Sequence, residues 1–195
     1  MKQNSGKSIL NAAITLDGYL AGEGEDLSFL SVVESKDEDY GFKEFMKSID
    51  VSIMGRRTFD WVMKHEPSYV STMNRTYVIT HHELPSNART NSDNIVQFEG
   101  DVCRLVRNLL EQGKNLFIVG GGEIILQLLQ ENLIDEFHIA IVPILIGKGI
   151  LLFKPGFPQT GLRLLDVKKY NTGLVMLKYA KEQNMNNLVD ARENN

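Results

Sequence analysis

Hydrophobic and polar positions follow two periodicities along the chain, and these predict strands and helices in turn. Short apolar runs at 8–16, 50–54, 76–80, 94–98 and 135–145 are typical of strands, and 115–130 predicts a strand, a glycine turn and a helix. One apolar stripe at helical spacing comprises Val102, Leu105, Val106, Leu109 and Leu110. Asp101 before it and Gly113 after it are placed to cap and to stop a helix.

Shorter signals fill the remaining segments. Residues 26–33 and 56–64 predict short helices, and 17–26, rich in glycine and acid, predicts a loop. Ser35 and Glu38 have the spacing of a capping box. The apolar residues that then fall at helical spacing are Phe42, Phe45, Met46 and Ile49. Strands at 162–170 and 174–180 flank 171–173, where Gly173 suits the left-handed position of a hairpin loop.

The alternation of strands with helices predicts an α/β fold. Most of its sheet should be parallel and covered on both faces, with the final hairpin adding antiparallel strands at one edge. We expect a single domain over 1–195, an ordered core over about 8–180, and polar flexible tails at 1–6 and 181–195. In such folds ligands bind beyond the carboxyl ends of the parallel strands.

Composition restricts the partners. The net charge of −4 argues against nucleic acid or an anionic membrane, because both need a basic surface. The single cysteine excludes an intrachain disulfide, and with no signal-peptide pattern at the start we expect a cytoplasmic protein. No apolar run approaches the length of a spanning helix. The four histidines do not combine with cysteine or acid into a metal-ligand spacing.

Two motifs follow predicted strands at the same edge of the sheet. Residues 55–58 read Gly-Arg-Arg-Thr, and residues 120–122 are three glycines before a helix. Arginine fits phosphate with a planar fork of donors, and a helix start with small residues can bind an anion. The alternatives are solvated surface arginines and a tight strand–helix turn. If both motifs bind phosphate, their joint placement suits a dinucleotide, and the extra arginines suit the third phosphate of NADPH.

These segments carry a family resemblance. The stretches "ITLDGYLAG", "MGRRTFD" and the run from Ile118 to Phe153 resemble the dihydrofolate-reductase-like superfamily. The sequence is most similar to the reductase domain of riboflavin biosynthesis, the RibD C-terminal domain, and its stand-alone relatives. The resemblance spans about 8–180 and implies a three-layer α/β fold, an NADPH-dependent reductase and a homodimer.

The resemblance also implies roles for individual residues. Residues that hold the adenosine-side phosphates would be Gly55, Arg56, Arg57 and Thr58. Thr80 and His81 would flank the adenosine. Residues at the pyrophosphate and nicotinamide end would be Gly120, Gly121, Gly122 and Glu123, with a cis peptide between Gly120 and Gly121.

Two acids are candidates for the catalytic role, because reduction of an imine or carbonyl needs a proton as well as a hydride. Asp17 matches a characteristic aspartate of the riboflavin branch, and Asp26 resembles the substrate-binding acid of dihydrofolate reductases. Their structural alternatives are a turn residue before glycine for Asp17 and a helix N-cap for Asp26.

Three functions follow as hypotheses. The first is NADPH-dependent reduction of a small heterocycle or sugar imine, as in 5-amino-6-(5-phosphoribosylamino)uracil reduction. The second is a dihydrofolate reductase, and the third is a dimeric cofactor-binding module with little catalysis. Tyr19 after Gly18 and the acidic loop behind it do not favour a phosphorylated substrate. The chain lacks the H-x-E and P-C-x-x-C motifs of a zinc deaminase, so it does not carry that activity.

Overall fold

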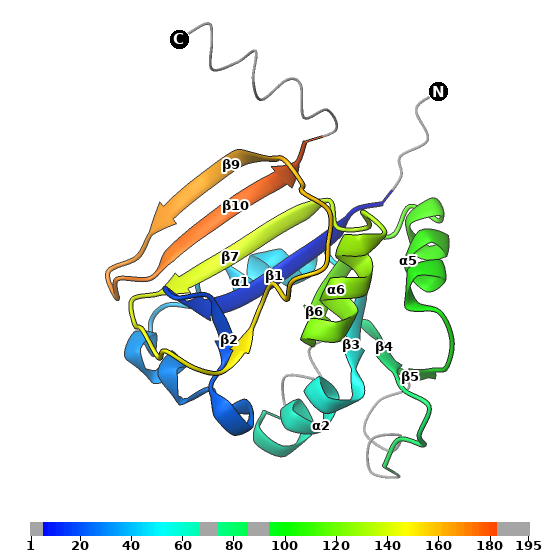
Figure 1. The fold of residues 1–195 in the computed structure, drawn as a ribbon, viewed down its shortest axis with the longest axis horizontal. Helices are drawn as coiled ribbons and strands as arrows, with labels where there is room; N and C mark the ends of the chain where they lie inside the picture. The colour runs from blue at the N-terminus through cyan, green and yellow to red at the C-terminus, as the bar shows by residue number, and fades with distance from the viewer. Residues whose placement is uncertain (1–5, 67–73, 86–93, 183–195) are drawn as a thin grey trace, which may run out of the picture.

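The computed structural model describes residues 6–66, 74–85 and 94–182, and its centre is one eight-stranded sheet (Figure 1). The strands are β1 (Ser8–Thr15), β3 (Val51–Gly55), β4 (Arg75–Ile79), β5 (Ile95–Phe98), β6 (Leu116–Gly120), β7 (Glu136–Val142), β9 (Leu162–Lys169) and β10 (Val175–Lys181). Their spatial order is β5-β4-β3-β6-β1-β7-β10-β9. The six strands from β5 to β7 are parallel, whereas β10 and β9 are antiparallel to their neighbours. The predicted parallel sheet with an antiparallel hairpin at one edge is confirmed.

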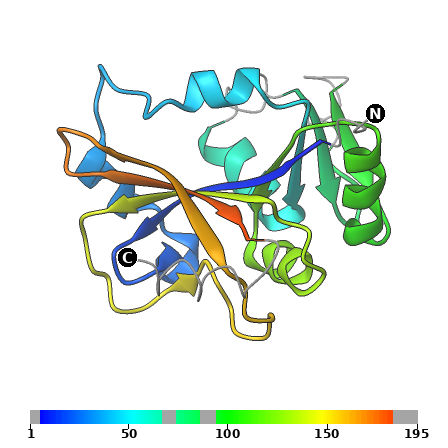
Figure 2. The same ribbon diagram turned by 90° about the horizontal axis from the view of Figure 1, so that it is seen from above.

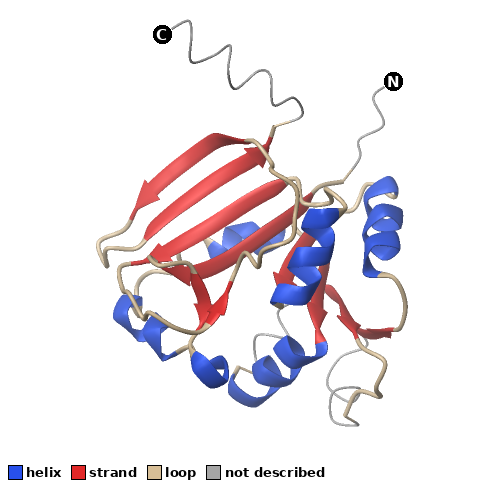
Figure 3. Ribbon diagram, in the orientation of Figure 1, coloured by secondary structure: helices blue, strands red, loops and turns tan. Residues whose placement is uncertain are grey.

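Helices cover both faces of this sheet, as Figures 2 and 3 show. On one face lie α5 (Val102–Glu111) and α6 (Gly122–Gln130), which pack on Leu10, Ile53 and Ile118. On the other lie α1 (Phe42–Lys47) and α2 (Arg56–His65), which pack on the alternate residues Ile9, Met54 and Phe117. The 3-10 helix η2 (Ser28–Val33) covers that second face over β7 and β10. The two faces therefore use successive residues of the same strands, as the side-chain alternation of a strand requires.

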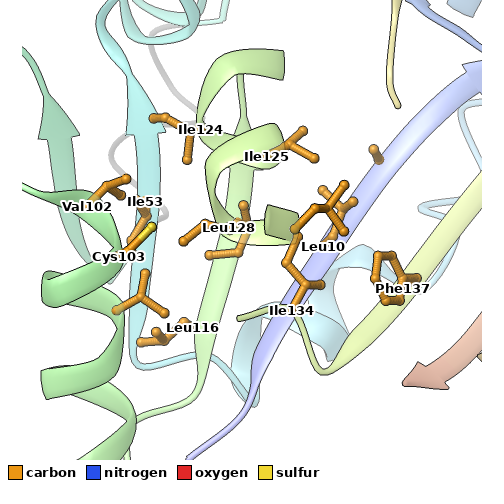
Figure 4. Close-up of a cluster of buried hydrophobic side chains, with 14 of the residues drawn as sticks. Leu10, Ile53, Val102, Cys103, Leu116, Ile124, Ile125, Leu128, Ile134 and Phe137 are labelled. Atoms are coloured by element: carbon orange, nitrogen blue, oxygen red, sulfur yellow. The ribbon is translucent and has the colours of Figure 1, made fainter. Parts of the chain in front are cut away.

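The apolar residues of α5 and α6 pack on the sheet in one hydrophobic core (Figure 4). Leu128 and Ile125 of α6 are fully buried against Leu10 and Ile53 of the sheet. Burial of each such side chain stabilises the fold by roughly 1.5–3 kcal/mol. At the start of α5 the Asp101 carboxylate accepts the N–H groups of Cys103 at 2.8 Å and Arg104 at 3.2 Å, which confirms the predicted cap.

Several local predictions differ from the structure. Ser35 does not cap a helix: α1 begins only at Phe42, and the Asp39 carboxylate accepts the N–H groups of Gly41 and Lys43 instead. The strand expected over 135–145 ends at Val142, because Pro143 has no N–H for the ladder. The hairpin loop is as predicted, with Gly173 at φ +87°.

The loop expected over 17–26 contains regular structure. Strand β2 (Tyr19–Ala21) pairs antiparallel with β8 (Ile150–Leu151) in a second, two-stranded sheet, and the 3-10 turn η1 (Glu23–Glu25) follows. Lys181, expected in the C-terminal tail, is the last residue of β10, and Gly6 donates its N–H to the Leu110 carbonyl. Glu182 is also described and donates its N–H to the Gly161 carbonyl; residues 1–5 and 183–195 of the expected tails lie outside the described residues.

Candidate active site

The two glycine-containing motifs meet because their strands are neighbours. β3 leads into α2 through Gly55, and β6 leads into α6 through Gly121. A Cβ atom added to Gly121 would lie 3.3 Å from Thr58 Oγ1, and one added to Gly55 would lie 3.3 Å from Ile124 Cδ1. Two helix N-termini thus converge at the carboxyl ends of adjacent parallel strands. Their first N–H groups have no partners within the helix, and the helix dipoles are positive at this end.

The glycine run has the backbone expected of it. The peptide between Gly120 and Gly121 is cis, as the family resemblance implied, and Gly120 has φ +125°. Gly122 lies against a residue from a distant segment: a Cβ added there would be 3.2 Å from Cε of Lys154. A side chain at Gly121 would therefore crowd Thr58, and one at Gly122 would crowd Lys154.

Arg56 connects the start of α2 to the turn after β4. Its Nε donates to both carboxylate oxygens of Asp60 at 2.8 Å, and its Nη1 donates to the Glu83 carbonyl at 2.8 Å. Thr80 is buried in that turn, where its Oγ1 accepts the N–H of His82. His81 is exposed and pairs with Glu99 at 3.2 Å. The structure therefore places Thr80 and His81 on a segment that Arg56 contacts directly.

Arg57 points away from α2 and is 79% exposed. It forms an ion pair with Glu25 of η1, a segment on the β2 side of the molecule. Glu23 of the same turn pairs with Lys148 at 2.6 Å. The short turn η1 therefore links the start of α2 to the loop between β7 and β8.

Lys154 is a candidate that sequence reasoning missed. It follows β8, forms an ion pair with Glu123 at the start of α6, and lies over Gly122. The segment is held at α6 by Leu152, which is buried in the same core as Ile125, and by Gln130, which donates to the Gly156 carbonyl. These partners are distant in sequence, so no local pattern signals the contact. An ammonium group beside the glycine run adds a positive charge where an anionic ligand would bind.

Asp17 is held by hydrogen bonds on both carboxylate oxygens. Thr15 Oγ1 donates to Oδ1 at 2.6 Å, and the Gly147 N–H donates to Oδ2 at 2.7 Å. The Thr15 hydroxyl, followed by the backbone N–H groups of Gly147 and Ile146, holds the pKa of Asp17 below its usual range. The contribution of Asp17 to stability is therefore present above the unfolded pKa of about 3.9 and is lost as the pH falls through the lower folded value. At neutral pH the group is ionised and acts as an acceptor.

Asp26 has a similar local environment. It accepts the Ser28 N–H at 2.9 Å and the Ser28 hydroxyl at 2.8 Å, directly before η2. These two hydrogen bonds, the backbone one first, hold the pKa of Asp26 below its usual range. The carboxylate thus closes a local turn onto Ser28 rather than capping the helix, because the N-cap residue of η2 is Leu27. Neither acid carries a stored proton at neutral pH.

Comparison with known proteins identifies the family. The model of the RibD C-terminal domain matches residues 7–176. The chain belongs to the RibD C-terminal domain family. The protein YwjB of Bacillus subtilis (strain 168), which bears the name "Uncharacterized protein", is 32% identical over 177 residues, covering 90% of this chain and 98% of that protein.

Solved structures share the fold. A putative riboflavin biosynthesis protein from Shewanella sp. PV-4 superposes with a TM-score of 0.81 at 26% identity and covers 91% of this chain and 99% of its own. The Thermotoga maritima diaminohydroxyphosphoribosylaminopyrimidine deaminase/5-amino-6-(5-phosphoribosylamino)uracil reductase has a TM-score of 0.69 at 13% identity; the match covers 91% of this chain and 57% of that one. The protein therefore has the dihydrofolate-reductase-like α/β fold. Its family and its structural relatives support a RibD-like reductase.

Three further observations concern binding chemistry. Within residues 6–66, 74–85 and 94–182, no helix is both long and apolar enough to cross a membrane. Over the same ranges no three His, Cys, Asp or Glu side chains gather as a metal site. Buried Cys103 lies in α5, where burial raises the pKa of its thiol.

Proposed function

We propose that this protein is an NADPH-dependent reductase that acts on a small heterocyclic or imine-containing substrate. The observation that supports the proposal best is the convergence of the α2 and α6 N-termini, with glycine at both contacts. This arrangement leaves room for an anionic ligand to approach the backbone, and Arg56, Arg57 and Lys154 supply cations around it.

Residues of this chain would divide the work of binding. Arg56, Arg57 and Thr58 would hold the adenosine-side phosphates, with Thr80 and His81 beside the adenosine. Gly120, Gly121, Gly122 and Glu123 would lie along the pyrophosphate and nicotinamide end. When bound, NADPH supplies a hydride. The accompanying proton would come from solvent, since the lowered pKa values of Asp17 and Asp26 leave both carboxylates ionised.

Asp17 and Asp26 would serve on the substrate side as fixed acceptors. Asp17 joins the end of β1 to the turn at Ile146 and Gly147, so it sets the position of the loop that borders the strand ends. An ionised acceptor orients N–H groups of a heterocycle without giving up a proton. Dihydrofolate reduction remains the second candidate, because Asp26 precedes η2 as the substrate-binding acid of that enzyme precedes a helix.

An assay of NADPH oxidation tests the proposal. The panel comprises a pterin, a ribosylaminouracil with and without its phosphate, and small carbonyl compounds. We expect turnover with at least one heterocycle, and we expect Asp17→Asn to lose most of it while NADPH affinity is retained. The pH dependence of turnover by the wild-type protein should show no ionisation assignable to Asp17 between pH 5 and 8, because the pKa of Asp17 is lowered. No binding of NADPH by the wild-type protein would exclude the function, and full activity of Asp17→Asn would exclude its role.

We also propose that the protein is a homodimer through the uncovered face of the C-terminal hairpin. Register places Val167, Leu177 and Ile139 side by side on one face of β9, β10 and β7, and Leu164 lies opposite Tyr179 on that face. Leu164 and Val167 are 50% and 52% exposed. A contiguous apolar face on an edge strand invites a partner.

The double substitution Leu164→Lys and Val167→Lys is expected to convert the dimer into a monomer. Two ammonium groups would have to be desolvated in an apolar contact, which is strongly unfavourable. Light scattering at high protein concentration measures the mass. Val32→Lys is the control, because Val32 is also exposed but lies on η2, over the opposite face. A monomeric wild-type protein, or a double variant that stays dimeric, would rule out this interface.

A further inference from the structure

Asn11 is a polar residue at the centre of the sheet. It lies in β1, which has β6 and β7 as its neighbours, and its partner across to β7 is His138. Parallel strands that are covered on both faces are usually continuous apolar runs, and asparagine is depleted in strands. On the same face of β1, Asn11 stands between Ile9 and Ala13, so it interrupts an apolar row. Packing of the core alone does not account for an amide at this position.

Coverage of this face is incomplete around Asn11. The apolar side chains under α1 and α2 form one cluster and those under η2 form another, and Asn11 is in neither. On the opposite face a single cluster lies under α5 and α6. Asn11 and Val119 are partly exposed. Leu10 and Ile118, which face the other way on the same two strands, are fully buried. Asn11 is therefore partly accessible although β1 is a central strand.

An aromatic ring borders Asn11 on one side. Phe45 of α1 packs edge-on against Phe117 of β6 and against His138 of β7, with ring centroids 5.1 and 5.7 Å apart. Because β1 lies between β6 and β7, the Phe45 ring crosses β1 beside Asn11. Nε2 of His138 lies 3.2 Å from Oε2 of Glu136, and this contact orients the imidazole. The border is thus an aromatic surface against which a planar ring can pack.

The glycine run borders Asn11 on another side. β1 and β6 are paired, and Val119 is the β6 residue next to Asn11 on this face. Gly120, whose peptide bond to Gly121 is cis, follows Val119 directly. A ring that contacts Asn11 would therefore lie close to the segment at which the nicotinamide end of the cofactor is proposed to bind.

The amide of Asn11 is available to a ligand. Its side chain makes no hydrogen bond within the part of the chain that the structure describes. An amide presents a carbonyl acceptor and an NH2 donor side by side. The complement of this pair is a ring edge on which an N–H group and a C=O group are adjacent, which is a lactam. Once water is displaced from the amide, such a partner is needed, because an unpaired polar group is costly.

We propose that Asn11 is a specificity-determining residue that binds the lactam edge of a heterocyclic substrate. This inference rests on the proposed function, because the ring has to lie beside the nicotinamide to receive a hydride. Positions N3 and C4 of a pterin or of a uracil carry such an edge. The Asn11 carbonyl accepts from the ring N–H, and its NH2 group donates to the ring C=O. The substrate class is therefore a lactam-containing heterocycle rather than an open-chain carbonyl compound.

Methylation of the substrate at N3 tests this contact, because it removes the lactam N–H. NADPH oxidation is measured with a pterin and with ribosylaminouracil, each as the parent compound and as its N3-methyl derivative. Wild-type protein should prefer the parent by about 10- to 100-fold in kcat/KM, the effect of leaving an amide in a binding site without its partner. Asn11→Ala removes the amide and leaves room for the methyl group, so this preference should fall to near one while NADPH affinity is retained.

Asn11→Asp provides a second readout that a merely structural role would not produce. A carboxylate still accepts from the ring N–H but cannot donate to the ring C=O. This variant should therefore have a lower kcat/KM for the parent compound and yet keep a preference for it over the N3-methyl derivative. Melting curves of both variants show whether each is folded.

Ser52→Ala is the matched control. Ser52 lies on the same face of another central strand, β3, and its hydroxyl also has no partner among the described residues, but it is fully buried. Its substitution should change neither kcat/KM nor the preference for the parent compound. An equal change in this control would show a general effect of altering the sheet and would overturn the role of Asn11.

The outcomes separate the two proposals. If wild-type protein reduces a lactam but does not distinguish it from its N3-methyl derivative, or if Asn11→Ala keeps the preference, the role of Asn11 is wrong and the proposed function stands. Binding of NADPH without turnover of either lactam, or turnover of carbonyl compounds alone, would overturn the substrate class. If wild-type protein does not bind NADPH, the proposed function fails and the role of Asn11 fails with it.

Discussion

Replacing Arg57 by alanine is expected to weaken the binding of both NADPH and NADH by about 10- to 100-fold, because both nucleotides carry the pyrophosphate that would bind at the converging helix starts. A charge-assisted hydrogen bond to phosphate contributes roughly 1.5–3 kcal/mol, and every 1.4 kcal/mol is a factor of about ten in affinity. Arg57 is available to bind a phosphate because its side chain is 79% exposed and its carboxylate partner, Glu25, belongs to a separate turn. Titrations with the two nucleotides at one ionic strength provide the comparison.

Arg104→Ala is the control for Arg57→Ala. Arg104 is also exposed and also lies in the first turn of a helix, but that helix is α5, which follows β5 and begins at Val102. Its removal should alter neither affinity. A loss confined to NADPH in Arg57→Ala would instead place the 2′-phosphate at this residue and contradict the expectation.

Arg56→Ala is expected to weaken NADPH binding much more than NADH binding, with an additional loss of thermal stability. Equal losses for the two nucleotides would remove the assignment of the 2′-phosphate to Arg56. Arg56 holds Asp60 within α2 and the Glu83 carbonyl in the turn after β4. Removing it leaves both acceptors without this donor and loosens the turn that carries Thr80 and His81. Circular dichroism melting curves would distinguish this structural loss, which Arg57→Ala should not show.

The parts of the site that lie next to strand ends were predictable from sequence. The motifs 55–58 and 120–122 each follow an apolar strand, and parallel strands bring their carboxyl ends to one edge. The helix cap at Asp101 and the hairpin glycine at Gly173 were also predictable, because each is encoded within a few residues. Local rules were sufficient wherever the interaction was local.

The parts made by long-range pairing were not predictable. Asp17 was recognised as a turn residue or a catalytic acid, yet its partners Ile146 and Gly147 lie 129 and 130 residues away. Glu25 and Lys154 flank the short strands β2 and β8, which pair with each other, and two- and three-residue strands have no periodicity to detect. The capping box expected at Ser35 does not form, although its spacing is correct. The helix begins only at Phe42, after a turn in which the Asp39 carboxylate accepts the Gly41 N–H.

Gly149→Ala is expected to destabilise the protein by about 3 kcal/mol. This substitution tests the small sheet of β2 and β8. A Cβ atom at residue 149 would lie 2.2 Å from the Ala21 carbonyl oxygen, and the backbone there has φ +147°. The Ala21 carbonyl oxygen and the Gly22 Cα atom, which would lie 3.0 Å away, both belong to the backbone, so the clash is relieved only by moving the two segments apart. For a chain of this length the expected fall in melting temperature is roughly 6–12 °C.

Gly147→Ala separates the clash from the backbone conformation. Gly147 also has a left-handed backbone, φ +74°, but nothing lies within 4 Å of its added Cβ. Its substitution should cost only the left-handed penalty, about 1 kcal/mol, or roughly 2–4 °C. The difference between the two variants therefore measures how tightly β2 and the loop after β7 are packed. Equal melting temperatures would mean that this contact does not hold the two strands together, and that the segment linking Glu25, Lys148 and Asp17 is not a unit.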